Sequence, residues 1–229
     1  SLVLEESGFD YNKKTQVEFA ARVDISESSG TNVDADFSVF GDPLHLNKIL
    51  NYDTFLLEGG KIEITAKVAG DIERMNELVS STSANFKIEN STLIHNPSKV
   101  RIPFSILEID VKNDDAILKS MVIDLPSGDS IKLSGELKNI TSIVPKVSGN
   151  RERISSKFNI YSNKVRFSDF MGLFKNIASG RKEKNTKSNP ALKSVVKDFY
   201  NKYQPEVSIN MDEFTFNKII INNFKTGFY

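Results

Sequence analysis

The feature that most constrains the fold is an alternation of apolar and polar residues that returns along the chain. In the stretch VEFAARVDI, Val17, Phe19 and Val23 fall on one side of an extended backbone, while Glu18 and Arg22 fall on the other. Because successive side chains of a β-strand point to opposite faces, this pattern predicts a strand with one buried face. The same period of two returns in VDADFSVF, KIEITAKVAG, SIKLSGELK and RISSKFNIY. The chain is therefore predicted to be mainly β.

Turn signals between these stretches predict how the strands pair. PSGDS, from Pro126 to Ser130, joins AILKSMVIDL to SIKLSGELK and predicts an antiparallel hairpin. EGGK, from Glu58 to Lys61, is a second turn signal. We therefore expect strands that are neighbours in the sequence to be neighbours in one antiparallel sheet.

Helical signals are few and short. Asp71 can cap a helix over IERMNELVSS, Ser168 can cap DFMGLFKNIAS, and ALKSVVKDFYNKY follows Pro190. These helices are expected at the ends or edges of the sheet. GRKEKNTKSNP, residues 180–190, contains no large apolar side chain and four Lys or Arg, so a flexible basic loop is predicted there.

Two segments of the chain have similar sequences. FSVFGDPLHLNKIL, residues 37–50, aligns without a gap with FNIYSNKVRFSDFM, residues 158–171, so that Phe37 matches Phe158 and Phe40 matches Tyr161. The shared pattern predicts a strand, a polar turn and a buried cap, within repeat units 15–82 and 83–178. Chance similarity between two strand ends is the alternative, since short apolar patterns are common. Residues 191–229 are expected to form a helix and the start of a further β unit.

Composition excludes several classes of protein. The 229 residues include 30 Lys plus Arg and 30 Asp plus Glu, so no long-range field favours nucleic acid or an anionic membrane. With no Cys, the chain has no disulfide and no thiolate metal site. No apolar run approaches the roughly 18 residues that span a bilayer. The N-terminus SLVLEESGFDY carries neither Met nor a signal sequence and reads as a piece of a longer protein.

Catalytic and metal-binding motifs are missing from the sequence. The two histidines are far apart in the sequence. His45 alternates with Leu44 and Leu46 and is predicted to point away from them to the surface, and His95 is predicted to lie on the surface in the loop LIHNPSK. Asp34 and Asp36 alternate with apolar residues and are predicted to form a solvated pair on the polar side of a strand, whereas Asp114 and Asp115 mark a turn. We therefore expect no enzyme activity, no catalytic residue, no metal site and no cofactor.

The chain resembles a family of bacterial envelope proteins. The resemblance is strongest from Asn85 to Phe170, in FKIENSTLIHNPSKVRIPFSILEIDVKNDDAILKSMVIDLPSGDSIKLSGELKN and in the strand and cap FNIYSNKVRFSDFM. LLEGGKIEITAKVAGDIERM and NPALKSVVKDFYNKYQPEVSINMDEFTFNKIIINNF also fit. These patterns of apolar spacing are similar to those of the AsmA-like family, which is related to TamB and to the bridge-like lipid transfer proteins. Nearly the whole chain, residues 1–229, is covered as one elongated domain.

The resemblance implies a long, strongly curved antiparallel sheet whose apolar concave face forms a groove for lipid. Family members sit at the inner membrane of diderm bacteria, reach through the periplasm and are implicated in moving phospholipid towards the outer membrane. The implied partner is a phospholipid or another acyl-chain lipid, held by a parent protein that is anchored in the inner membrane outside this piece. The alternation and the resemblance together predict these groove-lining residues: Val17, Phe19, Phe37, Val39, Ile62, Ile64, Phe86, Ile88, Leu133, Phe158 and Ile160. The alternative is a structural or adhesive β-rich module in which the same residues form a closed sandwich core.

Overall fold

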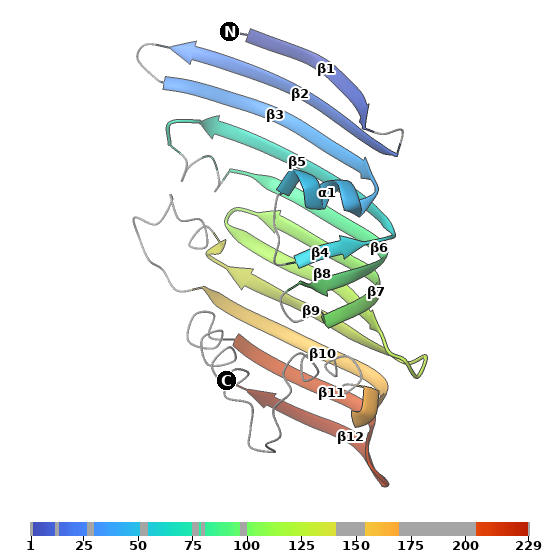
Figure 1. The fold of residues 1–229 in the computed structure, drawn as a ribbon. Helices are drawn as coiled ribbons and strands as arrows, with labels where there is room; N and C mark the ends of the chain where they lie inside the picture. Colours follow the sequence, from blue (N-terminus) through green and yellow to red (C-terminus); the bar gives the residue numbers. More distant parts are fainter. Residues whose placement is uncertain are drawn as a thin grey trace.

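The chain folds into one open sheet. The computed structural model describes residues 2–11, 14–26, 30–50, 55–74, 78, 81–96, 100–140, 154–169 and 205–228. These residues form a sheet of twelve strands, which lie in chain order except for β4 (Figure 1). The strands are β1 (Leu2–Tyr11), β2 (Thr15–Ser26), β3 (Gly30–Gly41), β4 (Phe55–Glu58), β5 (Lys61–Asp71), β6 (Ser83–His95), β7 (Val100–Lys112), β8 (Asp115–Asp124), β9 (Ser130–Lys138), β10 (Ser155–Arg166), β11 (Pro205–Phe216) and β12 (Ile219–Phe228).

Nearly all neighbouring strands pair antiparallel, which confirms the predicted fold class. The strands are long and curved, and the sheet does not close on itself (Figure 1). One pair departs from the prediction: β10 and β11 run parallel, with Phe158 opposite Val207 and Ile160 opposite Ile209. A parallel pair needs a long crossover connection, and residues 167–204 separate these two strands.

The EGGK segment does not make the hairpin turn that its glycines suggested. Both β4 and β5 pair with β6: β4 lies opposite Thr92–His95, and β5 lies opposite Ser83–Glu89. Gly59 and Gly60 therefore join two parts of one interrupted strand. Gly60 has a φ of 86°, and a Cβ there would lie 2.1 Å from the carbonyl oxygen of Glu89, so only glycine fits the kink.

Two other turns lie at or next to their predicted positions. Between β7 and β8, Asn113 and Asp114 have φ values of 50° and 71°, the backbone of a tight hairpin turn with two left-handed residues, one residue earlier than predicted because Asp115 already begins β8. Between β8 and β9, the N–H of Leu125 donates to the carbonyl of Asp129 over 2.9 Å and closes the PSGDS hairpin. Local turn chemistry therefore fixes the pairing of three consecutive strands.

The helical predictions are met in part. Phe167 to Asp169 are helical after β10, at the start of the helix predicted around Ser168, whereas helix α1 (Pro43–Leu50), which follows β3, was not predicted. The Asp71 carboxylate accepts the Glu73 N–H over 2.9 Å, as expected of a cap, although most of the helix predicted after it lies outside the described residues. The loop predicted at 180–190 and the helix predicted after Pro190 also lie outside them.

The two copies of the repeated segment fold differently. In the first copy β3 ends at Gly41 and α1 begins at Pro43, which is the predicted strand, turn and cap. In the second copy the residues SNK continue β10, which ends only at Arg166, so the predicted turn is wrong there. Leu44 in α1 is 48% exposed, whereas its counterpart Val165 in β10 is fully buried.

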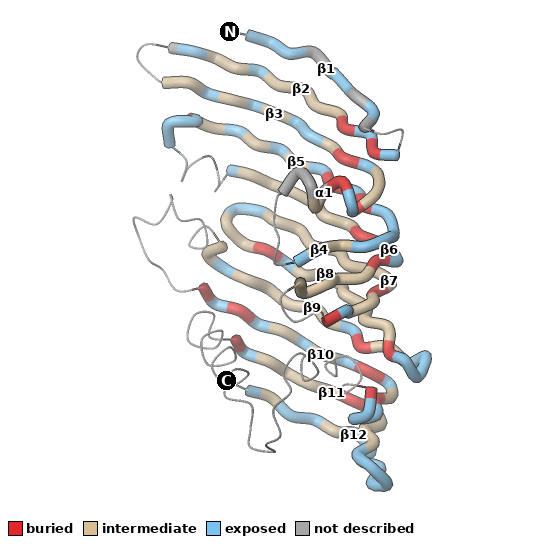
Figure 2. The backbone as a smooth tube through the Cα atoms, viewed as in Figure 1, coloured by how far each residue is buried: buried red, intermediate tan, exposed pale blue. Residues whose placement is uncertain are grey.

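The apolar core lies on one face of the sheet in two clusters. The first contains Val17, Val39, Ile62, Ile64, Ile88 and Phe104, and the second contains Leu125, Ile131, Val165 and Met211. In β2, β3 and β5 the buried positions gather towards the strand ends beside α1, as Figure 2 shows. The buried apolar side chains therefore distinguish one face of the sheet from the other.

Candidate functional site

The candidate site is the apolar face of the sheet. Cross-strand partners continue from strand to strand and form rows that cross the sheet. A central row begins at Val17 and runs through Val39, Ile64, Phe86, Ile109, Leu118, Gly135, Phe158 and Val207. Because partners in a ladder share a face, this row is one continuous band from β2 to β11.

Two further rows flank the central row on the same face. One contains Ile62, Ile88, Leu107, Met121, Leu133, Ile160 and Ile209. The other contains Phe19, Phe37, Ala66, Ala84, Val111, Ala116 and Leu137. The structure thus brings all eleven predicted groove residues into three adjacent rows. Whether these rows line a lipid groove stays a prediction.

The rows also correct the alignment of the two sequence copies. Val39, and not Phe37, lies in the same row as Phe158. Phe37 lies one row further towards the start of β3. The sequence match therefore pairs residues that are two positions apart in the sheet.

One part of the apolar face is covered by the chain itself. In this region Val17, Val39, Ile62, Ile64 and Ile88 are only 3–7% exposed, and we call it the covered part. Leu57 of β4 and Leu93 of β6 pack against this cluster, and α1 and β4 lie in front of the sheet in Figure 1. These side chains form a core of ordinary protein type, although they belong to an open sheet.

Short hydrogen bonds attach α1 to the sheet. The His45 Nδ1 lies 2.6 Å from the Thr15 hydroxyl of β2, and both residues are buried. Asn47 bonds β4 twice: its amide nitrogen donates to the Leu57 carbonyl over 2.7 Å, and its amide oxygen accepts the Leu57 N–H over 2.9 Å. Asn47 therefore mimics a further strand at the edge of β4.

The rest of the face is less protected. One row contains Phe19, Phe37, Ala66, Ala84 and Val111, and we call this row the open part. Phe37 is 41% exposed and Phe19 is half-buried. In the second half of the sheet, Leu133, Phe158 and Ile160 are also half-buried. Apolar side chains exposed together in this way mark a surface that can accept an apolar ligand or partner.

The position of Phe158 is set by the glycine opposite it. A Cβ at Gly135 would lie 2.3 Å from the Lys157 carbonyl oxygen and 2.6 Å from the Phe158 ring carbon Cδ1. The ring therefore occupies the space above Gly135 that any other side chain would fill. An aromatic ring over a strand glycine restores the apolar contact that the missing side chain would have made.

The predictions for the polar residues had mixed outcomes. His45 is not on the surface: it is 8% exposed within α1, because Asp42 and Pro43 start a helix where the sequence was interpreted as a strand. The Asp42 carboxylate accepts the Leu44 N–H over 2.9 Å, a capping signal that could have revealed this helix. His95 is the last residue of β6, and its ring lies 5.0 Å from that of Phe55. Asp36 is exposed as predicted and pairs with Lys67.

Several residues of the face were missed by the sequence analysis. Leu57, Leu93 and Phe104 pack on the first cluster, while Ile209, Phe214 and Phe224 pack on the second. The alternation in PEVSINMDEF carries a signal for Ile209. The folding back of β4 and of the end of β6 is a long-range event that has no local signal.

Comparison with known proteins adds no relative: no family model, no curated protein and no solved structure matches the chain. Within the described ranges, no three His, Asp or Glu side chains come together as metal ligands. No helix in the same ranges has the length and apolar character needed to cross a bilayer.

Proposed function

We propose that this chain is a lipid-binding segment of an AsmA-like envelope protein and that its apolar face holds the acyl chains of phospholipids. The observation that supports the proposal best is the run of three adjacent apolar rows across one open sheet. Such a surface gains about 0.8 kcal/mol for each acyl CH₂ group that it removes from water. No charge, metal or nucleophile is needed for this function.

The wider biological role follows from the same resemblance. A parent protein anchored in the inner membrane of a diderm bacterium would present this sheet in the periplasm. Phospholipid would then move along the apolar rows between the inner and the outer membrane. In this proposal the protein is a conduit and not an enzyme.

A structural or adhesive module is the second candidate. The covered part favours it, because Val17, Val39 and Ile64 are buried by protein and not by a ligand. If the open part were covered by a protein partner in the same way, the whole face would act as a core. The two candidates therefore differ in what occupies the open part and the second half of the sheet.

The decisive experiment is a change of Phe158 to Asp, with Asn159→Asp as its matched control. Phe158 lies on the apolar face, whereas its neighbour Asn159 is exposed on the other face. We expect native mass spectrometry to detect phospholipid on the purified unsubstituted chain, called the parent from here on, and on Asn159→Asp. Much less phospholipid should be detected on Phe158→Asp. The melting temperature of Phe158→Asp should stay close to that of the parent, because a carboxylate in an open groove remains hydrated.

The opposite result would favour the closed core. A charge without a partner in a core costs several kcal/mol, enough to unfold a typical domain. If Phe158→Asp unfolds while Asn159→Asp does not, Phe158 belongs to a core. If the parent carries no phospholipid at all, the conduit is contradicted directly.

A further inference from the structure

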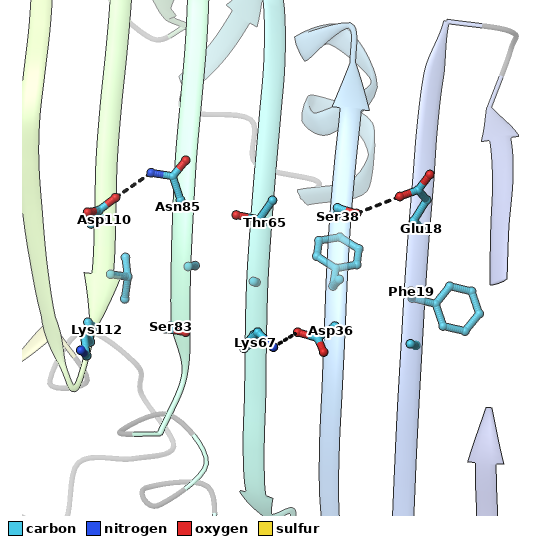
Figure 3. A pocket seen from close by; sticks show the side chains of 15 residues that line it. Glu18, Phe19, Asp36, Ser38, Thr65, Lys67, Ser83, Asn85, Asp110 and Lys112 are labelled. Carbon is cyan, nitrogen blue, oxygen red and sulfur yellow. Dashed lines mark hydrogen bonds and ion pairs between the residues drawn. The ribbon is translucent and has the colours of Figure 1, made fainter. Parts of the chain in front are cut away.

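Two hollows lie along β3, β5 and β6. The first, of about 650 Å³, also spans β2 and β7, and it is lined by two outward polar rows and by the open-part row of Phe19, Phe37, Ala66, Ala84 and Val111 between them (Figure 3). On the three middle strands the outward residues are Asp36, Ser38, Thr65, Lys67, Ser83 and Asn85. A second hollow, of about 420 Å³, is lined on the same three strands by Phe40, Asp42, Lys61, Glu63, Lys87 and Glu89.

The two hollows follow one another along the same strands, and we call them together the track. On β3, Asp36 and Ser38 line the first hollow, and the next outward residue, Phe40, lines the second. Strands β5 and β6 continue from one hollow to the other in the same alternating way. With a rise of roughly 3.3 Å per residue, the track from position 36 to position 42 is about 20 Å long. It can therefore hold several units of a linear polymer.

The charges in the track are already neutralised by one another. Lys67 pairs with Asp36 over 2.8 Å, and Lys87 pairs with Glu89 over 2.8 Å. Asp110, at the rim, accepts from Lys119 over 2.7 Å and from the Asn85 amide over 2.6 Å. The hydrogen bond from Lys119, followed by that from Asn85, lowers the pKa of Asp110. Asp36, Glu89 and Asp110 are thus each paired with a Lys, and the track offers hydrogen-bonding groups without a surplus of positive charge.

An aromatic ring, that of Phe40, lines the second hollow. Phe40 is 38% exposed on the outward face, opposite Gln16 on β2 and Glu63 on β5. Its counterpart in the second sequence copy, Tyr161, is also 38% exposed, and its hydroxyl donates to Asp212 over 2.9 Å. An exposed ring among polar groups provides a flat apolar surface beside hydrogen-bond donors and acceptors. This combination suits a ligand that has an apolar side and many polar groups.

We propose that the outward track over β3, β5 and β6 binds an uncharged carbohydrate chain. A sugar ring has C–H groups on its faces, which stack on Phe40, and hydroxyl groups at its rim, which bond Ser38, Thr65 and Asn85. An anionic polymer would meet Asp36, Glu63 and Glu89 without a compensating surplus of Lys. The proposed contacts are made by outward side chains and do not require lipid on the apolar rows.

The test compares two phenylalanines. Phe40 lines the second hollow, whereas Phe158 lies in the central apolar row of β10 and lines neither hollow. Binding of cellohexaose, chitohexaose and maltohexaose is measured by calorimetry on the parent, Phe40→Ala and Phe158→Ala, with heparin as the anionic comparison. We expect at least one neutral oligosaccharide to bind the parent. Its affinity should fall about tenfold in Phe40→Ala, equivalent to about 1.4 kcal/mol.

The remaining outcomes are equally clear. Phe158→Ala should bind the oligosaccharide as the parent does, and Phe40→Tyr, which keeps the ring, should retain binding. The proposal is overturned if none of the three oligosaccharides binds at millimolar concentration. It is also overturned if heparin binds more tightly, or if Phe158→Ala loses as much affinity as Phe40→Ala. Melting temperatures of all variants show whether a loss of binding reflects unfolding.

Discussion

The covered part and the open part of the apolar face have the same sequence pattern, but their side chains differ in exposure to solvent. Val39 and Phe37 are alternate residues of β3 and point to the same face, yet Val39 is 4% exposed and Phe37 is 41% exposed. Their immediate cross-strand neighbours are apolar in both cases. The difference arises from chain segments that return over one end of the sheet. Alternation therefore tells which face is apolar, but not which part of that face is available to a ligand.

The covering segments are held by a small number of contacts. The buried Thr15–His45 bond attaches α1 to β2, and Asn47 attaches α1 to β4. Glu58 of β4 bonds the Arg101 guanidinium of β7 through both carboxylate oxygens, at 2.8 and 3.0 Å. If these contacts define the covered part, changes within it should affect stability, whereas changes in the open part should affect ligand binding.

The largest effect is expected for Val39→Asp. This change places a carboxylate among Val17 and Ile64 with no cation in the cluster, at a cost of several kcal/mol. Because folded domains are stable by about 5–15 kcal/mol, we expect Val39→Asp to be largely unfolded at room temperature. Circular dichroism and urea denaturation measure this directly.

Phe37→Asp is the matched control for Val39→Asp. It introduces the same charge two residues away on the same face, but at a position that water already reaches. We expect its free energy of unfolding to lie within about 1 kcal/mol of the parent value. Equal destabilisation by both changes would show that the open part is as closed as the covered part, and the distinction between them would fail.

A smaller effect is expected for Asn47→Ala, which removes the two hydrogen bonds to Leu57. The partly buried N–H and carbonyl of Leu57 then lose their partners, at a cost of about 1–3 kcal/mol. Asn47→Asp keeps an acceptor for the Leu57 N–H and should lose less. Hydrogen exchange of the Leu57 amide should quicken in Asn47→Ala while that of β10 amides stays unchanged. Uniform quickening across the sheet would contradict a local role for Asn47.

Much of the fold follows from local sequence. The alternation in β2, β3, β5, β9 and β10 predicted those strands and their apolar face correctly. The cap at Asp71 and the turns at Asn113 and Pro126 were also readable, because each depends on only a few adjacent residues. Strand β1 was not predicted.

The features that sequence analysis missed are long-range. His45 was placed on the surface because its neighbours Leu44 and Leu46 were interpreted as strand residues, whereas its burial depends on Thr15, thirty residues earlier. Gly59 and Gly60 are typical of a hairpin, but the chain continues along β6, which is decided by the pairing of Leu57 with Leu93. The parallel pairing of β10 with β11 depends on a crossover of the chain and leaves no local pattern.

The smallest effect is expected for the ion pair that joins β4 to β7. The hydrogen bond from Arg101, followed by its charge, lowers the pKa of Glu58 below the ordinary value of 4.5. A lowered pKa in the folded state means that the pair stabilises the fold above the unfolded pKa of Glu58, and that this contribution is lost as the pH falls through the folded pKa. The pair is exposed, so the contribution is modest and sensitive to salt.

Carbon-detected NMR of the Glu58 carboxylate tests this pair. We expect its pKa to rise towards 4.5 in Arg101→Gln, and the difference in melting temperature between that variant and the parent to vanish at a pH below the folded pKa. Lys67→Gln, which removes a cation that pairs with Asp36 on β3, should leave the Glu58 titration unchanged. An unchanged Glu58 pKa in Arg101→Gln would mean that β4 is held over the covered part by Asn47 and apolar packing alone.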